Sequence, residues 1–139
     1  MKLEIFTLCD AAHDYAGKLC ILGAFDHLRA KAEPITHPHL AVAIRIRFHR
    51  IEEGAHKLRL TFADEDGKPV MAPVEAGVNV RFGAEARSAT MNLVLGVNAL
   101  KLERFGEYTV DLAVDGVHLG SHPLYVERLP EPPVVGPMP

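Results

Sequence analysis

The fold of this chain is decided by one stretch, residues 104–116, which reads Arg104-Phe105-Gly106-Glu107-Tyr108-Thr109-Val110-Asp111-Leu112-Ala113-Val114-Asp115-Gly116. From Tyr108 to Val114, apolar residues alternate with mostly polar ones, which predicts a β-strand with one buried face. Asp115 and Gly116 predict a tight hairpin turn, because such a turn needs positive φ at both central positions. The stretch therefore predicts a β-hairpin whose second strand runs through residues 117–126.

The same alternation recurs upstream of this hairpin. Residues 40–49 are the clearest case, and their apolar side chains are expected to face inward while the polar ones face outward. Residues 57–62 alternate likewise and lead to Asp66 and Gly67, which predict another tight hairpin turn. Shorter strands are expected at residues 3–9, 18–26, 78–82 and 88–95.

Two of these segments carry more specific expectations. Residues 18–26 are apolar over most of their length, which predicts a strand buried on both faces. Residues 27–39 are expected to hold no central strand, because Pro34 and Pro38 lack the amide that a sheet ladder needs. We therefore expect an all-β fold, a single antiparallel β-sandwich of about seven to nine strands.

Length and composition favour one folded domain. The chain has 139 residues, of which 48% are apolar, so it is long enough to bury a hydrophobic core. Residues 1–129 are expected to form the β-sandwich domain. Residues 130–139 contain repeated prolines and no alternation, and we expect them to form a flexible, disordered tail.

Charge and hydropathy exclude several functional classes. A formal net charge of −3 disfavours a dedicated nucleic-acid-binding protein, which usually carries a large basic excess. No apolar run is long enough for a membrane span. Glu4 and Asp10 interrupt the apolar residues near the start, so no export signal is expected and the cytoplasm is the expected compartment.

Cys9 and Cys20 lie on two strands that are expected to pair. A disulfide between them needs a specific geometry, which the spacing leaves open. Because thiols stay reduced in the cytoplasm, two buried free cysteines are the favoured alternative.

The entry to the strand at residues 105–110 is similar to strand F of immunoglobulin-like sandwiches. The resemblance implies that the hydroxyl of Tyr108 bonds back to the preceding corner, and it gives Gly106 a structural role beside it. The chain has no tryptophan, and Cys9 and Cys20 are too close in sequence to form the inter-sheet pair of antibody domains. The likeness is therefore one of architecture.

A wider resemblance covers about the first half of the chain. Its motifs are Leu8-Cys9-Asp10, Gly17-Lys18-Leu19 and Ile21-Leu22-Gly23-Ala24-Phe25-Asp26, followed by a proline-containing connection and the strand at residues 40–48. This pattern resembles a family of small uncharacterised bacterial proteins, a domain of unknown function. The resemblance implies a fold and supplies no catalytic residues.

Basic residues form one candidate binding site. If the strands at residues 40–49 and 57–62 pair, their basic side chains would form a stripe able to bind a carboxylate, a phosphate or a protein partner. Acidic residues of the final hairpin could meet this stripe within one chain or across a dimer. The favoured alternative is an ordinary solvated face. The residues of the stripe are Arg45, Arg47, Arg50, Lys57 and Arg59.

Histidines form a second candidate site. His37, His39 and His122 are the best candidates for metal ligands, but a metal needs three or four ligands that converge, and their spacing matches no familiar site. We therefore favour ordinary histidines and expect no cofactor. Ser121 stands beside His122, but neighbouring residues of a strand point to opposite faces, so a catalytic dyad is not expected.

Taken together, these observations favour a non-enzymatic binding or assembly module that acts through a sheet face or an edge strand. Its expected partner is another protein or a second copy of itself, as in a homodimer or other homo-oligomer, with no nucleic acid and no membrane involved. The alternative is a small-ligand or metal-binding protein, possibly an enzyme, that uses the histidines or the arginine stripe.

Overall fold

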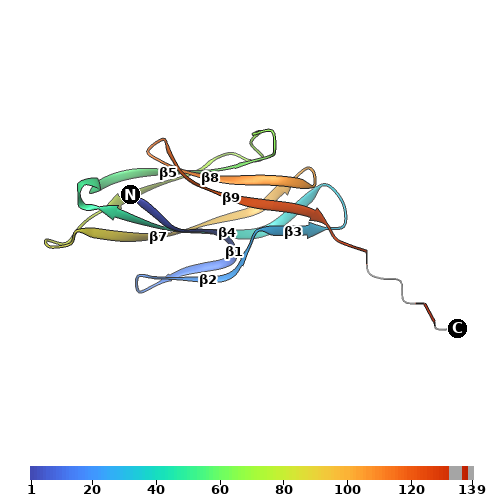
Figure 1. Cartoon of the computed structure of the whole chain (residues 1–139), viewed down its shortest axis with the longest axis horizontal. Helices are drawn as coiled ribbons and strands as arrows, with labels where there is room; N and C mark the ends of the chain where they lie inside the picture. Colours follow the sequence, from blue (N-terminus) through green and yellow to red (C-terminus); the bar gives the residue numbers. More distant parts are fainter. Residues whose placement is uncertain (132–135, 138–139) are drawn as a thin grey trace.

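The structure is a computed structural model that describes residues 1–131 and 136–137. These residues form β-strands and one short 3₁₀ turn, and they contain no α-helix (Figure 1). The all-β prediction is therefore confirmed. The elements are β1 (Lys2–Tyr15), β2 (Lys18–Phe25), β3 (His27–Ala30), β4 (Ile35–His49), η1 (Arg50–Glu52), β5 (Gly54–Ala63), β6 (Val74–Val80), β7 (Ser88–Leu102), β8 (Gly106–Val114) and β9 (Val117–Arg128).

The strands form two sheets around a common interior. One sheet has the order β2-β1-β4-β7 and the other has the order β3-β9-β8-β5-β6. Neighbouring strands run antiparallel except for β3 and β9, which are parallel from His27 opposite Tyr125 to Ala30 opposite Arg128. The expectation of a purely antiparallel fold was wrong at this edge, because β3 leaves the first sheet and runs beside the last strand of the chain.

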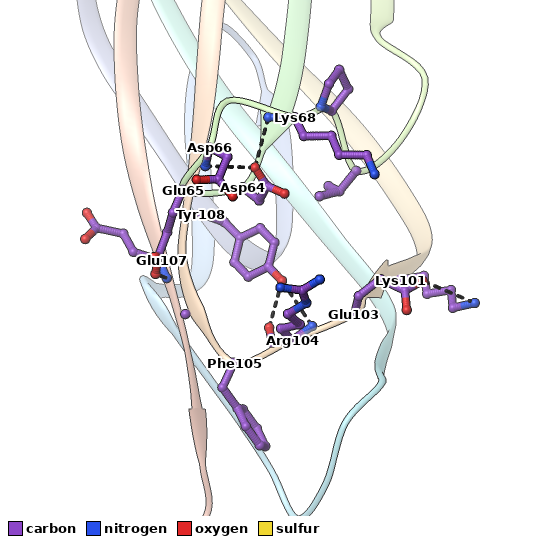
Figure 2. Close-up of a pocket in the computed structure, with 13 residues that line it drawn as sticks. Asp64, Glu65, Asp66, Lys68, Lys101, Glu103, Arg104, Phe105, Glu107 and Tyr108 are labelled. Carbon is purple, nitrogen blue, oxygen red and sulfur yellow. Dashed lines mark hydrogen bonds and ion pairs between the residues drawn. The ribbon is translucent and has the colours of Figure 1, made fainter.

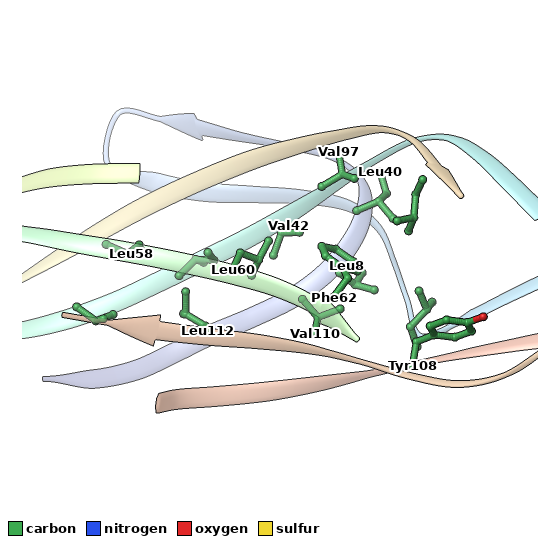
Figure 3. Packing of buried hydrophobic residues seen from close by; sticks show 14 of the residues in the cluster. Leu8, Leu40, Val42, Leu58, Leu60, Phe62, Val97, Tyr108, Val110 and Leu112 are labelled. Atoms are coloured by element: carbon green, nitrogen blue, oxygen red, sulfur yellow. The ribbon is translucent and has the colours of Figure 1, made fainter. Parts of the chain in front are cut away.

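The core lies between the inner faces of the two sheets. The alternating apolar residues of β4, from Leu40 to Phe48, are fully buried. On β5, the side chains of Leu58, Leu60 and Phe62 are at most 1% exposed. Figure 3 shows these side chains meeting those of β8 and β1 in one cluster. The predicted alternation therefore identified the buried faces of both central strands.

The predicted hairpin is present as β8 and β9. Its turn residues, Asp115 and Gly116, adopt φ values of 53° and 80°, as a tight turn requires. Gly67 likewise has a φ of 77° in the turn that follows β5. Asp66 does not adopt a positive φ, so a turn lies where this Asp-Gly pair predicted one, but it is not the tight two-residue type found at Asp115 and Gly116.

Strand β4 corrects the prediction for residues 27–39, because it begins at Ile35 and includes Pro38. Pairing between β1 and β4 stops at Ala41, so the β1 side of Pro38 has no neighbouring strand in the described part of the chain. On the other side, the register passes from His37 opposite Leu100 to His39 opposite Asn98. Proline is tolerated here because its missing amide interrupts little of the ladder.

Strand β2 corrects a second prediction. It is an edge strand with mostly exposed residues, and not a strand buried on both faces. Beyond Cys9, the β1–β2 hairpin lies against the outer face of its own sheet, where its apolar side chains cover Ala41 and Ala43. The side chain of Asn92 on β7 fixes the tip by donating to the Gly17 carbonyl at 3.1 Å. Some apolar residues of β2 therefore pack in this small outer cluster and not in the main core.

The two cysteines are free thiols and lie apart in the hairpin. Cys9 is buried opposite Ala24, whereas Cys20 is exposed opposite His13. Burial raises the pKa of the Cys9 thiol, with a smaller contribution from the Asp10 carboxylate. The expectation of two free cysteines agrees with the structure, but the expectation that both are buried was wrong for Cys20.

The predicted tail remains a prediction. Strand β9 ends at Arg128, and Pro130, Glu131 and residues 136–137 belong to no strand. Residues 132–135 and 138–139 of the predicted tail lie outside the described residues.

One side of the molecule is closed by a close approach of β1 to β9. The side chains of Leu3 and Phe6 lie over Gly120, and a Cβ atom at this glycine would clash with the Leu3 side chain. Next to it, the rings of Phe6 and His122 meet edge to face, with their centroids 6.1 Å apart. Gly120 therefore allows the two sheets to close along this side.

Replacing Gly120 by alanine should destabilise the fold, because the added methyl group must displace Leu3. The expected loss in the free energy of unfolding is about 1–3 kcal/mol, measured by urea denaturation. Gly77→Ala is the matched control, since a Cβ at Gly77 meets open space and should change stability by much less. Equal effects of the two substitutions would show that the β1–β9 contact is not tight.

Candidate functional site

The predicted basic stripe does not form, because its residues lie in different sheets. Strand β4 pairs with β1 and β7, whereas β5 pairs with β6 and β8. Arg45 and Arg47 therefore lie on the outer face of one sheet, and Lys57 and Arg59 on the outer face of the other. The short η1 turn carries the chain from one sheet to the other, which is why strands adjacent in sequence do not pair.

Arg45 and Arg47 share the carboxylate of Glu4 on β1. Their Nε atoms donate to its two oxygens at 3.1 Å and 2.8 Å. Hydrogen bonding by Arg47, and then by Arg45, holds the pKa of the Glu4 carboxyl below its ordinary value. Their Nη1 atoms both donate at 2.9 Å to side chains of β7, Arg45 to Asn92 and Arg47 to Ser88. These two arginines therefore tie β1, β4 and β7 together across the outer face.

The other basic residues of the predicted stripe are also engaged. Lys57 and Arg59 both approach the carboxylate of Glu75 on β6, at 3.1 Å and 3.4 Å. Arg50 donates to two carbonyl groups of the loop between β6 and β7, each at 2.9 Å. All five basic side chains thus make contacts within the fold and do not converge on a ligand.

The three histidines proposed as metal ligands do not meet. His39 shares a hydrogen bond with Asn98 at 2.7 Å, and His37 packs beside Phe25. One nitrogen of His37 and one of His122 are buried without a hydrogen-bond partner among the described residues. Within residues 1–131 and 136–137, no three His, Cys, Asp or Glu side chains are grouped to hold a metal ion.

A cluster of Ser121, Asp111 and His118 was not foreseen from the sequence. Ser121 lies opposite Asp111 in the β8–β9 pair, and its hydroxyl donates to the Asp111 carboxylate. Nε2 of His118 lies 2.9 Å from the Ser121 hydroxyl and 3.3 Å from Asp111. In a catalytic triad the histidine stands between the other two and uses both ring nitrogens. Here one nitrogen meets both groups and the hydroxyl proton faces the carboxylate, so the serine is not activated.

A groove lies at one end of the molecule, between the loop after β5 and the loop after β7. It has a volume of about 490 Å³, and Figure 2 shows its charged rim around Tyr108. The hydroxyl of Tyr108 donates to the Arg104 carbonyl at 2.7 Å, which is the bond implied by the resemblance at this strand entry. The groove is lined by Asp64, Glu65, Asp66, Lys68, Pro69, Val70, Lys101, Glu103, Arg104, Phe105, Gly106, Glu107 and Tyr108.

The carboxylates of this groove hold its loops in place. Glu65 accepts a hydrogen bond from the backbone of Glu107 at 2.7 Å and so joins the loop after β5 to the start of β8. Asp64 accepts from the backbone amides of Asp66 and Lys68, at 3.0 Å and 2.9 Å, and fixes the turn. Acidic and basic side chains are mixed around the groove, and none of the predicted arginines or metal-site histidines lines it.

Strand β7 is the feature that stands out as a binding surface. It pairs with β4 from Ser88 opposite His49 to Leu102 opposite Ile35, and its other edge has no neighbouring strand in the described structure. From Ser88 to Leu100 it contains neither a charged residue nor a proline. A long edge of this kind leaves backbone donors and acceptors free to pair with another strand.

The other sheet edges carry the features that usually prevent such pairing. Strand β3 has four residues, and β2 contains Gly23 with a φ of 69° against the side chain of Asp10. Strand β6 follows Pro73 and carries Glu75. Short strands, backbone irregularities, prolines and charges all hinder strand addition. Strand β7 has an irregularity of its own at Ala99, which has a φ of 52° and lies near the end of the strand. Within the described residues, the edge of β7 before Ala99 is therefore the one best suited to accept a strand.

An apolar seam accompanies this edge. Met91, Leu93 and Leu95 lie opposite inward-facing residues of β4 and pack against the core, yet they remain partly exposed. Val74 and Val78 on β6 are partly exposed in the same way. Because the β1–β9 side is closed, β6 and β7 border the opposite, open side of the two sheets. The free edge of β7 thus runs beside apolar surface.

The β7 edge could be recognised only in part from sequence. The alternation of residues 88–95 predicted a strand, but its length through Leu102 and its position at a sheet edge depend on the pairing order. The absence of charge from Ser88 to Leu100 is the signal in the sequence that marks the strand as unusual.

The chain belongs to the Family of unknown function (DUF6941), whose model matches residues 4–127. This agrees with the family resemblance of its first half and extends it through β9. No curated protein matches the chain. Among the described residues, no helix has the length and apolar character needed to cross a membrane.

His56 is a histidine whose surroundings favour its charged form. Its Nε2 lies 2.5 Å from the Glu52 carbonyl oxygen and its Nδ1 lies 2.6 Å from the Asp115 carboxylate. Both partners accept, so both nitrogens donate. The bond to Glu52, and then the one to Asp115, raises the pKa of His56. The Asp115 pKa is lowered by the backbone amide of Lys57 and then by His56. This clamp joins η1 to the β8–β9 turn.

The clamp predicts a pH-dependent stability. Because the folded pKa of His56 is raised, its contribution is fully present below the ordinary value of about 6.5 and is lost as pH rises through the folded pKa. At pH 6, the free energy of unfolding of wild type should exceed that of His56→Asn by about 1 kcal/mol. This difference, measured by urea denaturation, should shrink as the pH is raised towards 9. His13→Asn, at an exposed position, should follow wild type. A constant difference across this range would contradict the clamp.

Proposed function

We propose that this DUF6941 protein is a non-enzymatic protein-binding module that adds an extended strand of its partner to the free edge of β7. The observation that carries the proposal is the uncharged, proline-free edge from Ser88 to Leu100. Backbone hydrogen bonds would supply affinity along such an edge, and the adjacent side chains would select the partner. The partly exposed seam at Met91, Leu93 and Leu95 offers apolar surface for that selection.

The finer architecture forms part of the proposal. We propose an immunoglobulin-like sandwich, in which β9, β8, β5 and β6 correspond to one sheet of the variable type and β8 corresponds to strand F. The order of these strands supports this correspondence, and so does the bond from Tyr108 to Arg104 at the entry to β8. Sandwiches of this kind serve widely in recognition, so the proposed architecture is compatible with a binding role.

The arrangement of polar groups favours binding over catalysis. Ser121 directs its proton to Asp111, and the arginines of β4 are paired with Glu4. A ligand-binding alternative would be supported by arginines or histidines converging in a deep pocket, whereas the groove is lined by neither set. The free thiols of Cys9 and Cys20 are compatible with a cytoplasmic location, which we include in the proposal.

A lysine placed on the β7 edge should block strand addition. Gly96 suits the test, because it is exposed and a Cβ there meets only the His39 ring, at 3.5 Å. Ten-residue peptides selected from a random library on the wild-type protein should show alternating apolar positions. Their affinity, measured by fluorescence anisotropy, should fall about tenfold or more in Gly96→Lys, a loss of about 1.4 kcal/mol.

Gly77→Lys is the matched control, because Gly77 is exposed on the edge strand β6 and faces open space. It should bind the selected peptides like wild type. Hydrogen exchange should show new protection in residues 88–100 when a peptide binds. Peptides that bind Gly96→Lys as well as wild type, or that bind without protecting residues 88–100, would overturn the proposal.

A further inference from the structure

We infer that the strand received by β7 is β7 of a second copy of the same chain, paired antiparallel about a two-fold axis near Val94. The inference rests on the proposed strand-accepting role of β7 and names its partner. Such a contact would join two four-stranded sheets into one continuous sheet. The same surface would serve both copies, as in most symmetric dimers.

The inner face of β7 is complementary to itself in this register. Pairing about Val94 sets Leu93 of one copy opposite Leu95 of the second copy, and Met91 opposite Val97. In the single chain these side chains face the core side of the sheet. Cross-strand apolar pairs of this kind stabilise a sheet. The dimer would therefore extend the apolar interior of each copy and cover the seam beside the edge.

The outer face of β7 matches itself as well. In the same register Thr90 lies opposite Asn98 of the second copy, and Asn92 lies opposite Gly96. These residues are polar or small, so the pairing places no apolar side chain opposite a charge. A shift by one residue would turn the apolar set of one copy towards the polar face of the other, which disfavours that register.

Charged residues near both ends of the segment limit the length over which two copies can pair. Arg87 and Lys101 are equally distant from Val94 in sequence, and so are Glu85 and Glu103. Antiparallel pairing about Val94 would set Arg87 directly opposite Lys101 of the second copy and Glu85 directly opposite Glu103, and like charges in facing positions repel. Residues 85, 87 and 103 lie outside β7, so the pairing ends before these positions. The chain carries a net charge of −3, so two copies repel in general. The uncharged stretch of β7 is the part of the surface where they can meet.

The register can be tested by disulfide trapping of the full chain. In a Cys20→Ser background, with buried Cys9 retained, Val94→Cys should form a covalent dimer on mild oxidation, because residue 94 faces itself. Thr90→Cys and Asn98→Cys should each give little covalent dimer alone. Mixed together, these two variants should form the covalent heterodimer. Circular dichroism checks that each variant is folded.

Sedimentation equilibrium provides a second readout without new cysteines. Wild type and Gly77→Lys should dimerise with equal affinity, and Gly96→Lys should weaken the dimer at least tenfold. Gly96→Asp serves as a second variant if the lysine impairs folding. Monomeric wild type that still binds library peptides through β7 would overturn the self-pairing and leave the strand-accepting proposal intact. Wild type that is monomeric and also binds no library peptide would overturn both the self-pairing and the strand-accepting proposal. The self-pairing would also be overturned if Gly96→Lys left the dimer affinity unchanged and Val94→Cys formed no covalent dimer.

Discussion

Burial of one face of every central strand in a single core is the constraint on which this structure depends. Leu40 on β4, Leu60 on β5 and Leu112 on β8 are fully buried between the two sheets. Because side chains of a strand alternate between faces, the same constraint sends the charged residues of these strands to the outer surfaces. Apart from the small apolar cluster under the β1–β2 hairpin, the outer faces are polar, and their charged side chains join neighbouring strands.

The two sides of the paired sheets differ, and that difference directs attention to β7. On one side, Gly120 allows Leu3 to close the gap between β1 and β9. On the other side, the margins are β6 and β7, whose inward apolar residues stay partly exposed. A sheet edge is reactive only when its backbone is accessible and its side chains permit approach. Both conditions meet along the stretch from Ser88 to Asn98, before the irregular backbone of Ala99.

Groups that suggest chemistry in the sequence are engaged in the structure. Glu4 lies between Arg45 and Arg47, and the Ser121 hydroxyl is held by a carboxylate. A group that already has a strong hydrogen-bond partner must lose it before it can bind a ligand or attack a substrate. These contacts explain why the charged residues that the sequence suggests as sites hold neighbouring strands together in the structure.

The sequence by itself determined the strands and the tight turns, because alternation and the conformational needs of Asp115 and Gly116 are local properties. The local motif at residues 105–110 also indicated that the hydroxyl of Tyr108 bonds back to the preceding corner. Only the tertiary structure decided which strands pair. It separated Arg47 from Arg59 by placing them in different sheets, and it allowed Pro38 inside β4 by ending the β1 pairing before it. The order in which strands pair depends on contacts between residues that are distant in the chain, and the local alternation of apolar residues does not determine those contacts.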